Sequence, residues 1–121
     1  MTGEPVWITL NGVRGTGFHG VLPEERRDGQ EFLVDVRLEA VVDVSTDDLD
    51  DTVNYAEIAE RAITHITGEP LQLIETLAGR IADNVLSMDR VTTVEVVVHK
   101  PHAPIPVPFT DVTITVIRSK S

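Results

Sequence analysis

The segment VTTVEVVVHKPHAPIP, residues 91–106, joins a valine-rich run to a turn that contains three prolines. Alternating apolar side chains from Val91 to His99 predict a β-strand with one covered face. Lys100 follows in phase with the apolar positions, so its amine is expected on the covered side of the sheet. Burial there would disfavour the ammonium and make Lys100 a proton acceptor near neutral pH. A lysine at a strand end can instead extend its ammonium to water.

Three other stretches alternate in the same way. They predict strands over Val6–Val13, Glu31–Val41 and Asp111–Ile117. Glycines follow the first of these strands and predict a bend or bulge there; they are Gly12, Gly15, Gly17 and Gly20. Each strand carries polar residues on the face opposite its apolar side chains, which is typical of a half-buried antiparallel sheet.

Between the second and third strands, apolar residues recur with helical spacing. This spacing predicts helices over Tyr55–Ile66 and from about Leu71 to Ser87. The order strand, strand, helix, helix, strand, strand indicates one α+β domain over residues 1–121, with a four-stranded antiparallel sheet and both helices on one face. Edge-to-edge pairing between copies would close so small a sheet into a barrel. We therefore expect a ring-shaped homo-oligomer.

Composition narrows the function classes. A net charge of −10 in 121 residues argues against a nucleic-acid or anionic-membrane partner. No apolar run is long enough to span a membrane, and Met1–Pro5 lacks the features of a secretion signal, so we expect a cytoplasmic protein. The chain has no cysteine, and its histidines lack the paired spacing of a zinc site; they are His19, His65, His99 and His102. We expect no metal and no cofactor.

Four motifs, taken in order, resemble the dihydroneopterin aldolase family across nearly the whole chain. They are Gly17–Leu22 with Glu25, Gly29 and Gln30; Asp51–Tyr55; Leu73–Ala78; and Val98–Pro101 with Pro104–Pro106. The resemblance implies the family's tunnelling fold, with tetrameric rings that usually stack as octamers and pterin sites at subunit boundaries. It also implies retro-aldol cleavage of 7,8-dihydroneopterin in folate biosynthesis, with an accompanying epimerisation of the side chain. The substrate's ring imine accepts the electrons, so neither a metal nor a lysine Schiff base is required.

The resemblance also assigns roles to individual residues. Lys100 is implied as the acid/base group, working through a bound water. Tyr55, from a neighbouring subunit, is implied to pack near the bound pterin as a substrate-binding residue and to take part in protonation. Glu75 binds the guanidine-like edge of the pterin, where a carboxylate can accept two parallel N–H bonds. Backbone groups around Ile74 add hydrogen bonds, and Glu25 lies near the substrate tail and the catalytic lysine. Val53 contributes packing or a backbone contact, while Asn54 departs from the histidine that several relatives carry.

Other functions stay open at this point. A dihydroneopterin triphosphate epimerase has a similar fold, but its phosphorylated tail favours positive charge, and only Arg26, Arg27 and His102 offer it near the expected pocket. A zinc enzyme similar to pyruvoyl-tetrahydropterin synthase requires clustered histidines. A catalytically silent ring protein that binds a pterin or a protein would keep the fold without the chemistry. Each residue singled out above also has an ordinary structural role, such as a core aromatic for Tyr55 or a surface carboxylate for Glu75.

Overall fold

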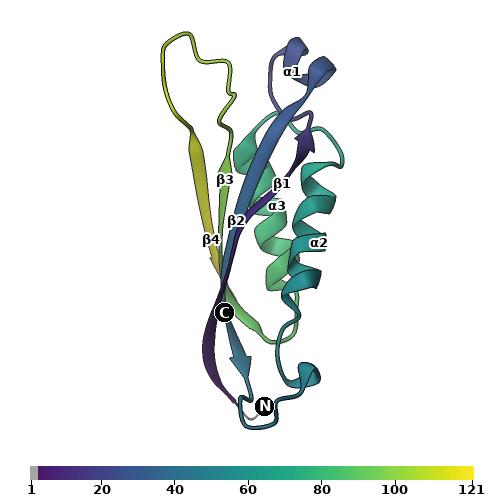
Figure 1. Ribbon diagram of the computed structural model, residues 1–121, viewed down its shortest axis with the longest axis vertical. Helices are drawn as coiled ribbons and strands as arrows, with labels where there is room; N and C mark the ends of the chain where they lie inside the picture. The colour runs from purple at the N-terminus through teal and green to yellow at the C-terminus, as the bar shows by residue number, and fades with distance from the viewer. Residues whose placement is uncertain (1–2) are drawn as a thin grey trace.

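The computed structural model describes residues 3–121 as one sheet with two long helices packed against one of its faces (Figure 1). Met1 and Thr2, which belong to the single domain expected over residues 1–121, lie outside the described residues. The elements in chain order are β1 (Glu4–Gly17), α1 (Pro23–Asp28), β2 (Gln30–Val42), the 3₁₀ helix η1 (Leu49–Asp51), α2 (Tyr55–Ile66), α3 (Ile74–Leu86), β3 (Val91–His99) and β4 (Thr113–Ser119).

The sheet has four strands in the order β1-β2-β3-β4, and every neighbouring pair is antiparallel. The α+β class, the four-stranded antiparallel sheet and the placement of both helices on one face are therefore as the sequence predicted. In the β2–β3 pair, Val34 lies opposite Val98 and Val36 lies opposite Val96, all four fully buried. These cross-strand valine pairs form the floor of the core beneath α2 and α3.

The central strand β2 shows the alternation most clearly. Its residues facing the helices are fully buried; they are Phe32, Val34, Val36, Leu38 and Ala40. Ile58, Ala62 and Ile66 of α2 cover them, and α3 adds its own stripe from Ile74 to Val85. Apolar side chains at both periodicities thus meet in a single core.

The strand β1 is longer than the sequence indicated. The glycines after Val13 do not interrupt it, and it continues to Gly17. A bulge places Asn11 and Gly12 opposite the single residue Asp35, and Gly12 adopts a φ of 71° that favours glycine. The extra residue brings Val13 into register with Val34, so the apolar positions on both sides of the bulge face the helices.

Other differences lie at the ends of elements. The helix α3 begins at Ile74 rather than near Leu71, and β4 covers Thr113–Ser119 rather than Asp111–Ile117. Two short helices, α1 and η1, occupy segments in which the sequence showed only polar loops. Within the part of the chain that the structure describes, no helix is both long and apolar enough to cross a bilayer.

Candidate active site

Lys100 forms an ion pair with Glu25. Its Nζ lies 2.6 Å from Oε2 of Glu25, and the two side chains are only 11% and 7% exposed. The strand alternation correctly predicted that Lys100 faces the covered side, and the alternative of an ammonium extended into water is wrong. The resemblance also placed Glu25 near this lysine, and the structure joins the two side chains directly.

Two further groups besides Lys100 bind the Glu25 carboxylate. Oε2 also accepts a hydrogen bond from Nε2 of Gln30 at 3.0 Å, and Oε1 accepts one from the backbone N–H of Leu22 at 3.3 Å. Burial raises the pKa of Glu25, but the hydrogen bonds from Lys100 and Leu22 outweigh burial and leave the pKa below its ordinary value. Glu25 is therefore a buried carboxylate that stays ionised beside Lys100.

Gly20 makes room for this carboxylate. A Cβ atom at Gly20 would collide with the carboxyl group of Glu25, and the residue has a φ of 152° that side chains rarely adopt. The carbonyl of Gly20 also accepts a hydrogen bond from Nε of Arg26 at 3.0 Å. The Gly-Phe-His-Gly segment is thus shaped around Glu25 by close approach of backbone and side chain.

His19 ties this segment to the connection between α2 and α3. Its fully buried ring lies 2.8 Å from the carbonyl of Ile66 through Nε2, and its Nδ1 accepts the N–H of Leu71 at 3.0 Å. The N–H of Gly20 in turn donates to the carbonyl of Leu71 at 2.8 Å. Burial lowers the pKa of His19, which fits a neutral ring with one donor and one acceptor nitrogen. The sequence placed His19 in a family motif and treated it as an improbable zinc ligand, but did not predict this structural role.

The connection leads directly into the start of α3, where Ile74 is 8% exposed and Glu75 is exposed. Leu73, the residue before the helix, makes no side-chain cap. The first backbone N–H groups of α3 therefore have no intrahelical acceptor and can bind a ligand. His19 and Gly20 place this helix start at the same end of the molecule as the Lys100–Glu25 pair.

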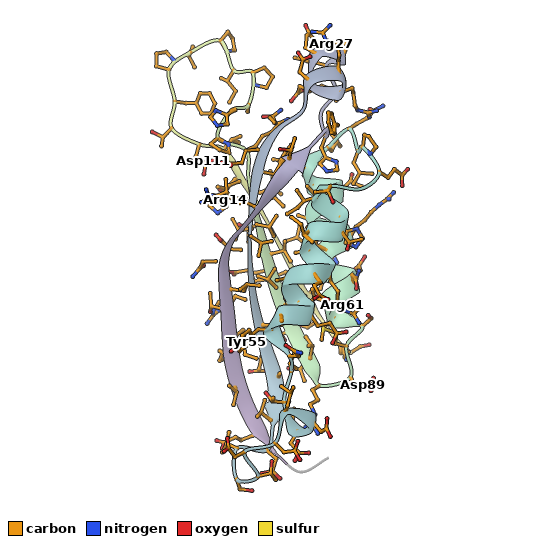
Figure 2. The ribbon with its side chains drawn as sticks, turned by 45° about the vertical axis from the view of Figure 1, so that its right-hand side comes forward. Arg14, Arg27, Tyr55, Arg61, Asp89 and Asp111 are labelled. Carbon is orange, nitrogen blue, oxygen red and sulfur yellow. The ribbon has the colours of Figure 1, made fainter. Side chains whose placement is uncertain are left out.

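Tyr55 lies elsewhere. It begins α2, is 65% exposed, and appears in the lower half of Figure 2, whereas Asp111 near the end of β3 lies in the upper part. The helix α2 has 12 residues, and a rise of 1.5 Å per residue puts its two ends roughly 16 Å apart. Because Ile66 at the far end contacts His19, Tyr55 cannot approach Lys100 within one chain.

The surface beside Tyr55 is hollowed. A depression of about 210 Å³ is lined by residues of the preceding motif and of the α3–β3 turn; they are Thr52, Val53, Asn54, Glu57, Met88, Asp89 and Arg90. Val53 is buried at 5% exposure, and Oδ1 of Asn54 caps α2 by accepting the N–H of Ala56 at 3.0 Å. Asn54 therefore has a clear local role as a helix cap.

Two charged segments that the sequence assigned to solvated loops contain short helices instead. The pair Arg26-Arg27 lies in α1, where the Arg26 side chain donates to the Gly20 carbonyl and Arg27 forms an ion pair with Asp28 at 2.9 Å.

The acidic segment before α2 contains η1, which the Asp48 side chain caps. A depression of about 400 Å³ at this segment is lined by Asp43, Asp47 and Asp48 among others. It lies at the end of β2 remote from Phe32 and Lys100, so it supplies no acid or base to that lysine.

The four histidines stay apart, as the sequence indicated. His19 is buried beneath α2, His65 lies on α2, His99 ends β3 and His102 is exposed in the following turn. Among residues 3–121, no three histidine, aspartate or glutamate side chains are grouped closely enough to hold a metal ion.

Comparison with known proteins identifies the chain's relatives. The family model described as dihydroneopterin aldolase matches residues 8–117, which include Glu25, Tyr55, Glu75 and Lys100. The chain belongs to the dihydroneopterin aldolase family. The dihydroneopterin aldolase of Streptomyces coelicolor is 50% identical over 115 residues, covering 93% of this chain and 97% of that protein. The Bacillus subtilis dihydroneopterin aldolase is 43% identical over 119 residues, covering 94% and 98%.

Solved structures share the aldolase fold. The Escherichia coli dihydroneopterin aldolase in complex with neopterin superimposes with a TM-score of 0.82 at 24% identity, covering 94% of this chain and 99% of that one. The Burkholderia aldolase bound to guanine gives a TM-score of 0.82 at 24% identity, covering 97% and 93%. The family fold expected from the motifs is thereby confirmed.

Proposed function

We propose that this dihydroneopterin aldolase uses Lys100 as the acid/base group of its retro-aldol reaction. The observation that carries the proposal is the Lys100–Glu25 ion pair, buried at the end of the molecule where α3 begins. A lysine amine held beside a carboxylate in a buried site is a candidate group for proton transfer. Glu25 fixes the position of Nζ, and Gln30 and the Leu22 N–H fix the position of Glu25.

In this mechanism the substrate supplies the electron sink. In its neutral form, the Lys100 amine accepts, through a bound water, the proton of the hydroxyl on the second side-chain carbon of 7,8-dihydroneopterin, and the resulting ammonium is the source of the proton used in the last step. The bond between the first and second side-chain carbons breaks, glycolaldehyde leaves, and the electron pair moves into the ring imine. The first side-chain carbon then takes up a proton to give 6-hydroxymethyl-7,8-dihydropterin. The protein's part is orientation and proton transfer, with no metal or cofactor.

Glu75 and the start of α3 form the proposed pterin-binding wall. The Glu75 carboxylate is exposed, so it is available to accept two N–H bonds from the aminopyrimidine edge of the ring. The uncapped N–H groups around Ile74 supply donors beside it. The relatives solved with neopterin and with guanine hold ligands that share this edge, which supports a planar aminopyrimidine as the ligand here.

A second copy of the chain completes the site. Tyr55 is exposed, adjoins the depression that contains Val53, and lies too far from Lys100 to act within its own chain. Pairing of sheet edges between copies would place a neighbouring copy beside the surface that carries Tyr55. We propose tetrameric rings, stacked as octamers, with a pterin site at each subunit boundary and Tyr55 acting in protonation.

The test is complementation between two inactive variants, Lys100→Ala and Tyr55→Phe. Each is purified alone, and the two are then mixed, dissociated and reassembled. If the site takes Lys100 from one copy and Tyr55 from another, about a quarter of the sites in an equal mixture contain both residues and turnover of dihydroneopterin returns. If the mixture stays as inactive as the separate variants, the shared site is wrong.

The unphosphorylated substrate is favoured over a triphosphate. Arg26 and Arg27, the arginines that the sequence offered near the expected pocket, are engaged with the Gly20 carbonyl and with Asp28. Turnover of the two substrates measured side by side decides between them. Epimerisation of the side chain, which follows if glycolaldehyde rebinds in the opposite pose before release, stays a prediction, as does the cytoplasmic location.

A further inference from the structure

A chain of hydrogen bonds runs across the sheet face opposite the helices, at the Lys100 end. Nε2 of His99 lies 2.6 Å from Oδ2 of Asp35, and Nδ1 of His99 lies 2.7 Å from Oδ2 of Asp111. Oδ1 of Asp35 also accepts the backbone N–H of Gly12 at 2.8 Å. The chain therefore links the bulge of β1 to β2, to the last residue of β3, and to the segment just before β4.

The position of His99 connects this chain to the reactive amine. His99 and Lys100 are consecutive, so their side chains point to opposite faces of the sheet. The backbone N–H of Lys100 donates to the carbonyl of Val112 at 2.9 Å, next to the His99–Asp111 contact. These two contacts lie side by side and close the base of the loop between β3 and β4 at the residue that carries the amine.

The contacts select the protonation state of His99. Each aspartate accepts hydrogen bonds only, and a neutral imidazole has a single N–H, so only the imidazolium donates to both carboxylates. Burial lowers the pKa of His99, but the hydrogen bonds to Asp111 and Asp35 outweigh it and raise the pKa above its ordinary value of 6.5. We call this arrangement, in which Asp35 and Asp111 hold the two sides of the His99 ring, the His99 clamp. Both of its hydrogen bonds are present below the raised pKa of His99, and one of them is lost as pH rises through that pKa.

Other charged residues share this face. Arg14 of β1 lies in the same cross-strand row as His99, through Leu33. Arg37 of β2 stacks on Trp7 at 4.1 Å, and Glu95 of β3 lies opposite Arg37. The carboxylates of Asp35 and Asp111 are the groups in hydrogen-bond contact with the His99 ring, so they dominate its charge state.

We propose that His99, held as an imidazolium between Asp35 and Asp111, is a positioning residue that fixes the backbone at Lys100 so that the amine meets Glu25 and the substrate. The inference rests on the proposed role of Lys100. The loop beyond Lys100 has few restraints of its own, since Ile105, Val107 and Phe109 are each at least 37% exposed. A misplacement of about 1 Å at a reacting group can cost roughly 100-fold in rate, so a restraint at the loop base affects turnover directly.

The test compares two substitutions of Asp111 with a matched control. Asp111→Ala removes one side of the clamp, and we expect kcat to fall about tenfold while KM changes by about twofold or less, because pterin binding lies on α3. Asp111→Asn offers an N–H donor to Nδ1 of His99, so a neutral imidazole can make both contacts. We therefore expect this variant to retain kcat. The fall in kcat at alkaline pH, which we expect in the wild type when His99 loses its second proton, should move to higher pH. Thr93→Ala removes the 3.1 Å hydroxyl contact with Ser119 at the other end of the same strand pair and leaves kcat unchanged.

The measurements are steady-state kinetics over a range of pH, thermal unfolding of each variant, and the ¹⁵N shifts of the His99 ring near neutral pH. A doubly protonated ring in the wild-type enzyme agrees with the proposal, and a neutral ring contradicts it. The proposal is also wrong if Asp111→Ala keeps wild-type kcat, or if Asp111→Asn leaves the pH profile unchanged. Should Asp111→Ala fail to fold, the Asp111→Asn profile and the ring shifts still decide.

The Lys100→Ala variant is measured in parallel to separate this inference from the proposed function. If Lys100→Ala keeps full turnover, the role of Lys100 is wrong and the clamp positions nothing catalytic. If Lys100→Ala loses turnover while Asp111→Ala does not, only the role of His99 is wrong.

Discussion

The two ends of the molecule prepare their functional groups in opposite ways. At the Lys100 end, the amine is 11% exposed and is bound to Glu25, which Gln30 and the Leu22 N–H hold in turn. At the other end, Tyr55 is 65% exposed. At the Lys100 end, residues of the same chain supply all of these contacts. At the other end, the Tyr55 ring lies exposed beside a depression in the surface.

This difference separates what one chain can do from what it needs a second copy to do. Charges buried in a protein interior require partners within the same fold, because leaving one unpaired is costly. An exposed tyrosine has no such requirement, so its contacts can come from a second copy of the chain. The comparison therefore predicts that substitutions in the buried Lys100–Glu25 pair affect both stability and turnover, whereas substitutions of exposed site residues affect function alone.

The largest expected effect follows from Lys100→Ala. We expect kcat to fall by about 10²- to 10⁴-fold, the range that acid/base groups contribute. The same change leaves the Glu25 carboxylate buried without its cation, and we expect a stability loss of about 2–4 kcal/mol. Turnover assays and chemical denaturation measure the two effects separately.

The double variant Lys100→Ala/Glu25→Gln is the matched control, because it removes both charges. It should recover most of the lost stability and none of the lost turnover. Equal free energies of unfolding for the single and double variants would show that a buried Glu25 without Lys100 does not destabilise the protein.

Glu75→Ala tests the exposed part of the site. Loss of two charge-assisted hydrogen bonds to the pterin should raise KM for dihydroneopterin by about 10- to 100-fold, while the thermal midpoint stays near that of the wild type. Glu60→Ala removes an exposed helix carboxylate away from the site and should change neither quantity. A normal KM in Glu75→Ala would remove this residue from substrate binding.

The smallest effect concerns acid stability. The pKa of Glu25 is lowered from its ordinary value of 4.5, so the carboxylate's contribution to stability is complete above that value and is lost as pH falls through the lower folded pKa. Thermal midpoints measured between about pH 3 and 6 should fall less steeply in Glu25→Gln than in the wild type. Glu24→Gln, an exposed neighbour in α1, should follow the wild-type profile; a Glu25→Gln profile that does the same contradicts the linkage.

The local pattern predicted most of the fold because each element keeps one face on a single core. Alternation located β2 and β3 to within one residue, and helical spacing located α2 at Tyr55–Ile66. The local pattern failed to locate the ends of elements that are set by contacts between residues distant in sequence. The helix α3 begins at Ile74 because His19 and Gly20 hold Leu71 in an extended connection, and β1 runs past its glycines because the bulge restores its register.

The candidate residues divide in the same way. Motif order alone indicated Glu25, Tyr55, Ile74, Glu75 and Lys100, and the parity of Lys100 indicated the face on which it lies. The resemblance placed Glu25 near Lys100, but the ion pair that joins them across 75 residues of sequence, and the pairing of His99 with Asp35 and Asp111, came only from the structure. Periodicity reports which side of an element is buried, since burial repeats along the chain, but partners of a buried charge are chosen by the packing of distant segments.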